Sequence, residues 1–109
     1  MMKLTELREK LGLRLVCGEE DKGFDGVYAG DLLSRAMSHV EADNLWITIM
    51  PNTNVIAVAS LTEAAAVILA EEVELQPEAL TAAAENGITV YSSDKTVYEL
   101  CVMISEVQK

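Results

Sequence analysis

The sequence has little of what catalytic and metal sites are built from. Its 109 residues include one histidine, two cysteines, two prolines and 5% aromatic side chains. Triads and zinc sites need several histidine, cysteine or acidic side chains at defined spacing. His39 has no such partner, so we interpret it as a surface residue. The sequence therefore predicts no catalytic site, no metal site and no enzyme.

The cysteines, Cys17 and Cys101, stand alone and far apart, without C-x-x-C or cluster spacing. Isolated cysteines in apolar stretches are typical of reduced core residues of cytoplasmic proteins. The N-terminus MMKLTELREKLG is too charged for a signal peptide, and no apolar run approaches the roughly 20 residues that span a bilayer. We expect a cytoplasmic protein without a membrane partner.

Basic residues are also few. Eight Lys and Arg face 18 Asp and Glu, which leaves a net charge of −10, and no three basic residues cluster. Such a surface repels nucleic acid, so we expect no nucleic-acid partner. Neither the G-x-x-x-x-G-K-[ST] nor the G-x-G-x-x-G nucleotide fingerprint occurs. The polar stretch 19–26, EEDKGFDG, lacks the alternating ligands of a calcium loop and predicts an exposed loop.

Half of the residues are apolar, which suffices for one core but, at this length, not for two. We expect a single domain over residues 1–109. Residues 26–52 predict a strand, an amphipathic helix capped by Asp31, and a second strand over 45–50. That last run is uncharged and rich in β-branched residues, as in a strand covered on both faces. The stretch is therefore a β-α-β crossover.

The rest of the chain continues this alternation. Residues 53–61 are apolar nearly all round, so helix and strand both fit, and we favour helix because the next parallel strand needs a crossover. Ser92, Ser93 and Asp94 are predicted to cap the last helix. The fold class is α/β, a three-layer α/β/α domain with a mostly parallel sheet of four to five strands. Further helices are predicted at 3–11 and 77–86, and further strands at 13–17, 65–70 and 88–91.

A ligand site is predicted beyond the carboxyl ends of the strands, where open parallel sheets bind their ligands. Small and polar residues occupy these ends, and their hydroxyls, amides and helix N-terminal N–H groups suit a ribose, an amide or a phosphate. Ordinary turns and caps use the same residues, so both interpretations stay open. The predicted ligand-binding residues are Gly30, Asp31, Asn52, Thr53, Ser92, Ser93 and Asp94.

Several runs carry a resemblance to a known family. VYAGDLLS at 27–34, DNLWITI at 43–49 and NVIAVA at 54–59 resemble the DRTGG domain family, and GITVYSSD at 87–94 is similar to its last strand and turn. The resemblance covers residues 10–105. It implies an α/β/α domain similar to the N-terminal domain of HPr kinase/phosphorylase, without the kinase site. The string Asp-Arg-Thr-Gly-Gly itself does not occur.

The resemblance also carries functional expectations. DRTGG domains occur in CBS-domain pyrophosphatases, where they accompany adenine-nucleotide regulation. We therefore expect a non-catalytic regulatory or accessory domain, without a cofactor, that binds a small ligand such as an adenine nucleotide, or a partner subunit. We also expect a homodimer, because domains this small often extend their core by pairing. The alternative is a hydrogenase-associated redox or iron–sulfur accessory protein, because some small relatives are named iron–sulfur-binding hydrogenase. Two isolated cysteines, however, cannot supply a cluster with four thiolates from one chain.

Overall fold

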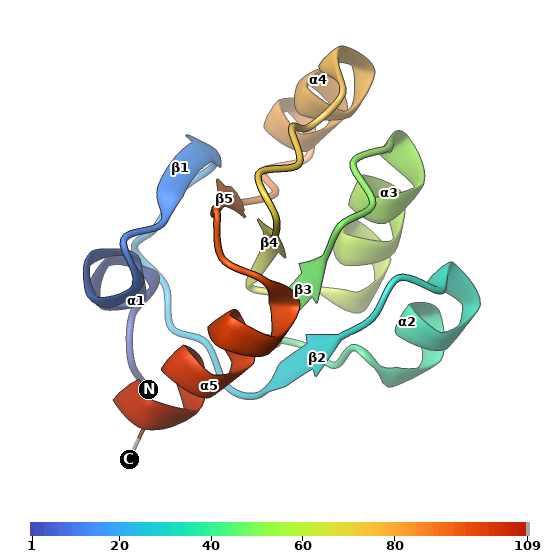
Figure 1. The fold of residues 1–109 in the computed structure, drawn as a ribbon. Coiled ribbons are helices and arrows are strands. Elements are labelled where there is room, and N and C mark those ends of the chain that lie inside the picture. The colour runs from blue at the N-terminus through green and yellow to red at the C-terminus, as the bar shows by residue number, and fades with distance from the viewer. Residues whose placement is uncertain (109) are drawn as a thin grey trace.

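The computed structural model describes residues 1–108 and shows helices and strands alternating along most of the chain (Figure 1). Each predicted helix and strand is present, with differences only at the ends. The helices are α1 (Leu4–Leu11), α2 (Leu33–His39), α3 (Thr53–Thr62), α4 (Pro77–Glu85) and α5 (Val97–Val107). The strands are β1 (Arg14–Cys17), β2 (Val27–Ala29), β3 (Leu45–Thr48), β4 (Ala66–Leu69) and β5 (Val90–Ser92).

The strands form one five-stranded sheet in the order β1-β5-β4-β3-β2. Strands β2, β3, β4 and β5 are parallel, which confirms the mostly parallel sheet, but β1 pairs antiparallel with β5. Gly18, which follows β1, therefore does not lie at the carboxyl edge of the parallel strands. Because β1 runs the other way, its first residue, Arg14, lies at that edge instead. Antiparallel edge strands are common on otherwise parallel sheets.

Helices cover both faces of the sheet, so the three-layer prediction is confirmed. Helices α1 and α5 lie on one face, and α2, α3 and α4 on the other (Figure 1). The alternation of side chains along β3 divides the core between the two faces. Leu45 and Ile47 pack towards α1 and α5, while Trp46, fully buried, packs towards the other three helices.

Two predicted helix caps are wrong. Helix α2 has Leu32 at its N-cap and no side-chain cap, because the Asp31 carboxylate is engaged elsewhere. Helix α5 is capped by Thr96 in a reciprocal capping box with Glu99, and residues 92–94 precede that cap. Helix α3 does have a side-chain cap, since Asn52 accepts from the Val55 N–H.

The segment 19–26 is less exposed than predicted. Phe24 is buried, with 2% of its surface accessible. Its N–H donates to the Met2 carbonyl, and the Leu4 N–H donates to the Lys22 carbonyl, so the segment is bound to the start of the chain. The polar composition concealed this anchoring, because one aromatic residue is enough to bury the centre of a short loop.

Candidate functional site

The seven predicted site residues lie along the carboxyl edge of the parallel strands, but they do not form one cluster. Ser92 ends β5, and Asp31 follows β2. Strands β4 and β3 lie between them. Neighbouring strands are about 4.8 Å apart, so these two ends are separated by about 14 Å. The structure therefore divides the predicted residues into three groups.

The first group lines a pocket. Ser92, Ser93 and Asp94 contribute to a cavity of about 410 Å³ between the start of β1 and the loops that follow β4 and β5. Arg14 is the residue that the sequence analysis missed, since only the antiparallel direction of β1 brings it here. Its Nε donates to the Ser92 Oγ at 2.9 Å. The other lining residues are Gly12, Glu72 and Glu74.

The loop after β4 shapes one wall of this pocket. Glu71 and Glu72 have positive φ values of 59° and 60°, a conformation that costs a residue with a side chain roughly 1–2 kcal/mol. The Glu71 N–H donates to the Lys95 carbonyl at 2.9 Å, and the Glu72 N–H donates to the Ser93 carbonyl at 2.8 Å. These bonds hold the strained turn against the loop after β5, and Glu72 of this turn lines the pocket.

The charge of the pocket is mainly negative. Its lining residues include three carboxylates, those of Glu72, Glu74 and Asp94, and one cationic side chain, that of Arg14. Carboxylates accept hydrogen bonds from hydroxyl and amino groups, and they repel phosphates unless a cation lies between them. The pocket therefore suits hydroxyl and amino groups better than an uncompensated polyphosphate.

The second group, Gly30 and Asp31, joins the ends of β2 and β3. The Asp31 Oδ1 accepts from the Thr48 hydroxyl at 2.6 Å and from the Ile49 N–H at 3.0 Å. The Gly30 carbonyl accepts from the indole N–H of Trp46 at 2.9 Å. A Cβ on Gly30 would lie 3.1 Å from the Tyr28 hydroxyl oxygen, so the space beside this glycine is taken by Tyr28.

The third group is the start of α3. The Asn52 Oδ1 accepts from the Val55 N–H at 3.2 Å, so its side chain acts as a helix cap. Thr53 is exposed, and it lines a separate groove between α3 and α4 together with Ala82 and Asn86. Asn52 and Thr53 are thus next to the carboxyl edge but outside the pocket that contains Arg14.

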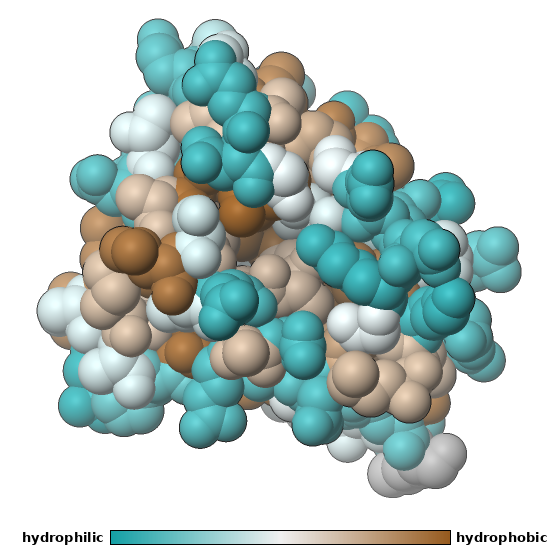
Figure 2. Space-filling view, turned by 180° about the vertical axis from the view of Figure 1, so that it is seen from behind, coloured by the Kyte–Doolittle hydropathy of each residue, from teal (hydrophilic) through white to brown (hydrophobic). Residues whose placement is uncertain are grey.

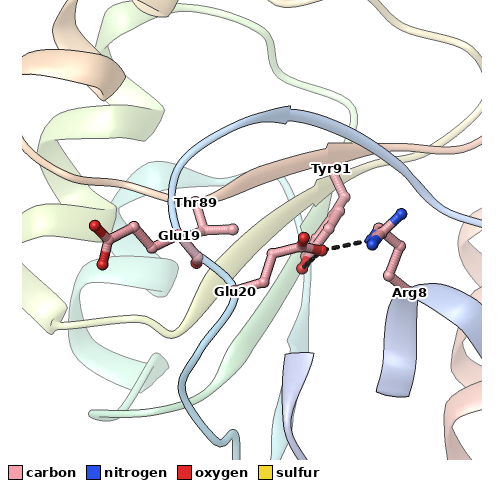
Figure 3. Close-up of polar contacts among 5 residues, drawn as sticks. All are labelled: Arg8, Glu19, Glu20, Thr89 and Tyr91. Carbon is pink, nitrogen blue, oxygen red and sulfur yellow. Dashed lines mark hydrogen bonds and ion pairs between the residues drawn. The ribbon is translucent and has the colours of Figure 1, made fainter. Parts of the chain in front are cut away.

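A partly buried polar network at the opposite end of the sheet was not predicted. The Glu20 Oε1 accepts from the Arg8 Nε at 2.6 Å and from the Tyr91 hydroxyl at 2.8 Å (Figure 3). Beside it, the Thr89 hydroxyl donates to the Glu19 carbonyl at 2.6 Å. The network fastens the segment after β1 to α1 and β5. The sequence signal for it, a single glutamate within an acidic run, is too weak to have been recognised.

Tyr91 is fully buried in this network. Burial and then the hydrogen bond to Glu20 raise the pKa of its phenol far above the ordinary value of 10. A phenol with such a pKa keeps its proton at neutral pH and is a poor general acid or base. The network is therefore a structural connection.

The two cysteines lie on opposite faces of the sheet. Cys17 packs with the core beneath α2, α3 and α4, and Cys101 packs with the core beneath α1 and α5. Burial raises the pKa of both thiols, which disfavours the thiolate that binds metals. Within residues 1–108, no group of three His, Cys, Asp or Glu side chains is arranged to hold a metal ion. The placement of the cysteines gives the iron–sulfur alternative no support.

The face seen from behind is mixed, with hydrophilic side chains along much of its outline and apolar ones between them (Figure 2). None of the helices within the described residues combines the length and the apolar character needed to cross a membrane.

Fold and pocket together define a three-layer α/β domain with a small polar pocket at the strand ends. The family model described as the DRTGG domain matches residues 6–107. The chain belongs to the DRTGG domain family, and the resemblance seen in the sequence is confirmed. The search of curated proteins gave no match to this sequence.

A solved structure has the same fold. It contains the CBS and DRTGG domains of the regulatory region of a Clostridium perfringens pyrophosphatase, complexed with its activator diadenosine tetraphosphate. The TM-score is 0.74 at 13% sequence identity, and the match covers 93% of this chain but 45% of that one. This chain thus corresponds to less than half of that regulatory region. At this identity, the likeness concerns the fold.

Proposed function

We propose that this chain is a non-catalytic regulatory domain that binds an adenine nucleotide in the pocket lined by Arg14, Ser92, Ser93 and Asp94. Membership of the DRTGG family supports the regulatory role, as does the likeness to part of a regulatory region that binds a nucleotide activator. The single observation that carries the proposal is this pocket, which combines a guanidinium, two serines and a carboxylate at the strand ends.

Each type of group has a part in the proposed complex. A guanidinium binds phosphate oxygens well, and Arg14 is the cationic residue of the pocket lining. The carboxylate of Asp94 can accept from ribose hydroxyls, and Glu72 and Glu74 can accept from an exocyclic amine. Because these carboxylates would repel a polyphosphate, we expect nucleotides with longer phosphate chains to bind as their Mg²⁺ complexes.

The remaining predicted residues need a longer ligand. Gly30, Asp31, Asn52 and Thr53 lie outside the pocket, and the end of β2 is about 14 Å from the end of β5. A mononucleotide in the pocket would not reach Asp31. We propose that these residues contact only a ligand that extends along the edge of the sheet, such as a dinucleotide.

Thermal unfolding with AMP, ADP, ATP and diadenosine tetraphosphate, each with and without Mg²⁺, tests the proposal. A ligand at 100 times its dissociation constant adds about 2.7 kcal/mol to the free energy of unfolding. We expect a saturable shift that Arg14→Gln abolishes. Arg35→Gln is the matched control, because it removes the same charge from an exposed position on α2. Equal shifts in both variants would contradict the assigned pocket, and no shift with any nucleotide would contradict nucleotide binding.

We also propose that the domain works as a homodimer in the cytoplasm. Several large apolar side chains remain exposed, among them Val27, Tyr98 and Val102. A small domain gains buried apolar area when it pairs. Sedimentation velocity at high micromolar concentration tests this part separately, and a monomer under those conditions would refute it.

A further inference from the structure

Strand β2 is an edge strand, so the backbone groups on its outer side are not paired with another strand of residues 1–108. The Leu45 N–H donates to the Gly26 carbonyl, and the Gly30 N–H donates to the Ile47 carbonyl. Residues 26 and 30 therefore direct their backbone groups towards β3, and backbone groups alternate along a strand. Val27 and Ala29 accordingly direct their N–H and C=O groups outwards, away from the sheet. Both residues are exposed.

An apolar groove runs beside this edge. Val27 and Ala29 line it from β2, and Cys101, Ile104, Ser105 and Gln108 line it from α5. Figure 1 shows α5 lying beside β2 at this end of the sheet. A further strand added to β2 would therefore have one of its faces against the flank of α5.

The sequence around β2 is nearly symmetric when it is read in either direction. Residues 25–31 are Asp-Gly-Val-Tyr-Ala-Gly-Asp, with Tyr28 at the centre. An isologous dimer needs a surface that is complementary to itself, and two antiparallel copies of a palindromic strand meet this condition. We infer that β2 pairs antiparallel with β2 of a second copy of this chain, with the two-fold axis at Tyr28.

The register follows from the outward groups. Val27 of one copy lies opposite Ala29 of the second copy. Each such pair exchanges N–H···O=C bonds, because the backbone groups of both residues point away from β3. Tyr28 then lies opposite Tyr28 of the second copy, in a cross-strand aromatic pair. Gly26, with φ of +84°, ends the extended stretch on one side, so the pairing is short.

The pairing also brings the two α5 helices together. A two-fold axis perpendicular to the sheet keeps both helices on the same face, one on each side of the junction. Tyr98 and Val102 of α5 are 77% and 41% exposed, so α5 has apolar area that a second copy could cover. A short strand pair alone buries less than the roughly 800 Å² per partner of a stable interface, and the α5 flanks supply further apolar area.

The other edge of the sheet is a poorer candidate. The register of β1 against β5 shifts between Leu15 and Cys17, as at a β-bulge. Bulges disrupt the regular row of backbone groups and protect an edge from pairing. Leu15 is 38% exposed and Val27 is 37% exposed, so the two edges offer matched sites for mutation.

This inference rests on the homodimer part of the proposed function and names its surface; it is independent of nucleotide binding. Sedimentation velocity of the wild type, Val27→Glu and Leu15→Glu tests it. We expect a wild-type dimer, a dimer of Leu15→Glu, and a dissociation constant at least about tenfold weaker for Val27→Glu. A wild-type monomer would refute both the homodimer and the surface. A dimer that Val27→Glu leaves intact would refute the surface alone.

A second variant distinguishes the loss of the interface from the loss of the fold. Ala29→Pro removes an N–H that, by the alternation along β2, points away from β3 and is not paired with another strand of residues 1–108, so the bonds of β2 with β3 are kept while the pairing with a second copy is lost. We expect a folded monomer by circular dichroism and sedimentation. A folded dimer of Ala29→Pro would contradict the inference.

A cross-link tests the register. In a background of Cys17→Ala and Cys101→Ala, Tyr28→Cys places two thiols directly opposite each other across the axis, at a Cα separation of about 4.5 Å, which permits a disulfide. Leu15→Cys in the same background is the control at the other edge. Mild oxidation should cross-link the first variant and not the second. Equal cross-linking of both, or of neither, would contradict a pairing centred on Tyr28.

The inferred register has a cost that gives a further test. Just beyond the two ends of the pairing, the register brings Asp25 of one copy towards Asp31 of the second copy, and like charges near each other are unfavourable. We expect Asp25→Asn to tighten the dimer about threefold and to weaken its dependence on salt. A dimer that Asp25→Asn weakens would contradict this register.

Discussion

Asp31 connects the ends of two parallel strands through Thr48. Asp31 follows β2, and its Oδ1 lies 2.6 Å from the hydroxyl oxygen of the fully buried Thr48 at the end of β3. The same oxygen accepts from the Ile49 N–H at 3.0 Å. The carboxylate that the sequence assigned to a helix cap thus holds the central crossover at the edge where ligands are expected.

Removing this carboxylate should destabilise the domain. We expect Asp31→Ala to lower the free energy of unfolding by about 1–2 kcal/mol, because hydrogen bonds to a charged acceptor are lost and the buried Thr48 hydroxyl loses the acceptor of its proton. Urea unfolding measures this change. Thr48→Val completes a double-mutant cycle, and the interaction energy should be at least about 0.5 kcal/mol. Strictly additive effects would show that the 2.6 Å contact contributes nothing.

The raised pKa of Tyr91 predicts a dependence of stability on alkaline pH. The folded state keeps the phenolic proton, while the unfolded chain loses it near the ordinary pKa of 10. The contribution of Tyr91 is therefore complete below that pH and falls as the pH rises above it. Tyr91→Phe lacks the ionisable group and should show a shallower decline between about pH 9 and 12 in unfolding experiments.

The same variant tests the network of Figure 3 at neutral pH. Tyr91→Phe removes the hydroxyl that donates to Glu20 and should cost about 1–2 kcal/mol. Tyr98→Phe is the control, since Tyr98 is 77% exposed. If the two variants have equal free energies of unfolding and the same dependence on alkaline pH, the hydrogen bond between Tyr91 and Glu20 does not contribute to stability.

The capping box of α5 makes a third prediction. Thr96 accepts from the Glu99 N–H, and the Glu99 carboxylate accepts from the Thr96 N–H. Thr96→Ala should lower the free energy of unfolding by about 1 kcal/mol. Chemical denaturation measures the loss, and Thr81→Ala, which changes an exposed threonine inside α4, serves as the comparison.

The pKa of Glu99 is lowered by its hydrogen bonds with Thr96, so its contribution has a definite sign with pH. It is present above the unfolded pKa near 4.5 and is lost as the pH falls through the folded value. We expect Glu99→Gln to reduce the acid sensitivity of the domain below about pH 5. If Glu99→Gln loses stability at acid pH as steeply as the wild type, the hydrogen bonds between Glu99 and Thr96 are not a cause of the acid sensitivity.

The order and type of the elements were predictable because their signals are local. The uncharged run of β3, the turn before α3 and Pro77 at the start of α4 act through neighbouring residues. The Asn52 cap was predictable for the same reason. The direction of β1 was not, because a short strand carries no local mark of whether its partner runs parallel.

The direction of β1 also decides which residues of the pocket could be predicted from the sequence. Ser92, Ser93 and Asp94 follow a recognisable strand, so they could be predicted as candidates. Arg14 joins them only because β1 pairs with β5, where Arg14 lies opposite Ser92, a residue distant from it in the sequence. The Thr96 cap is a different case, since the T-x-x-E pattern is present in the sequence and competed with the Ser92–Ser93–Asp94 turn.

The most direct measurement is calorimetric titration of the wild type, Arg14→Gln and Arg35→Gln with AMP and with the Mg²⁺ complex of diadenosine tetraphosphate. If Arg14 contributes a charge-assisted bond to phosphate, its loss should weaken binding by about 10- to 100-fold, while Arg35→Gln binds like the wild type. Saturable heats that Arg14→Gln leaves unchanged, or no binding by the wild type, would contradict a nucleotide-binding regulatory pocket at this edge of the sheet.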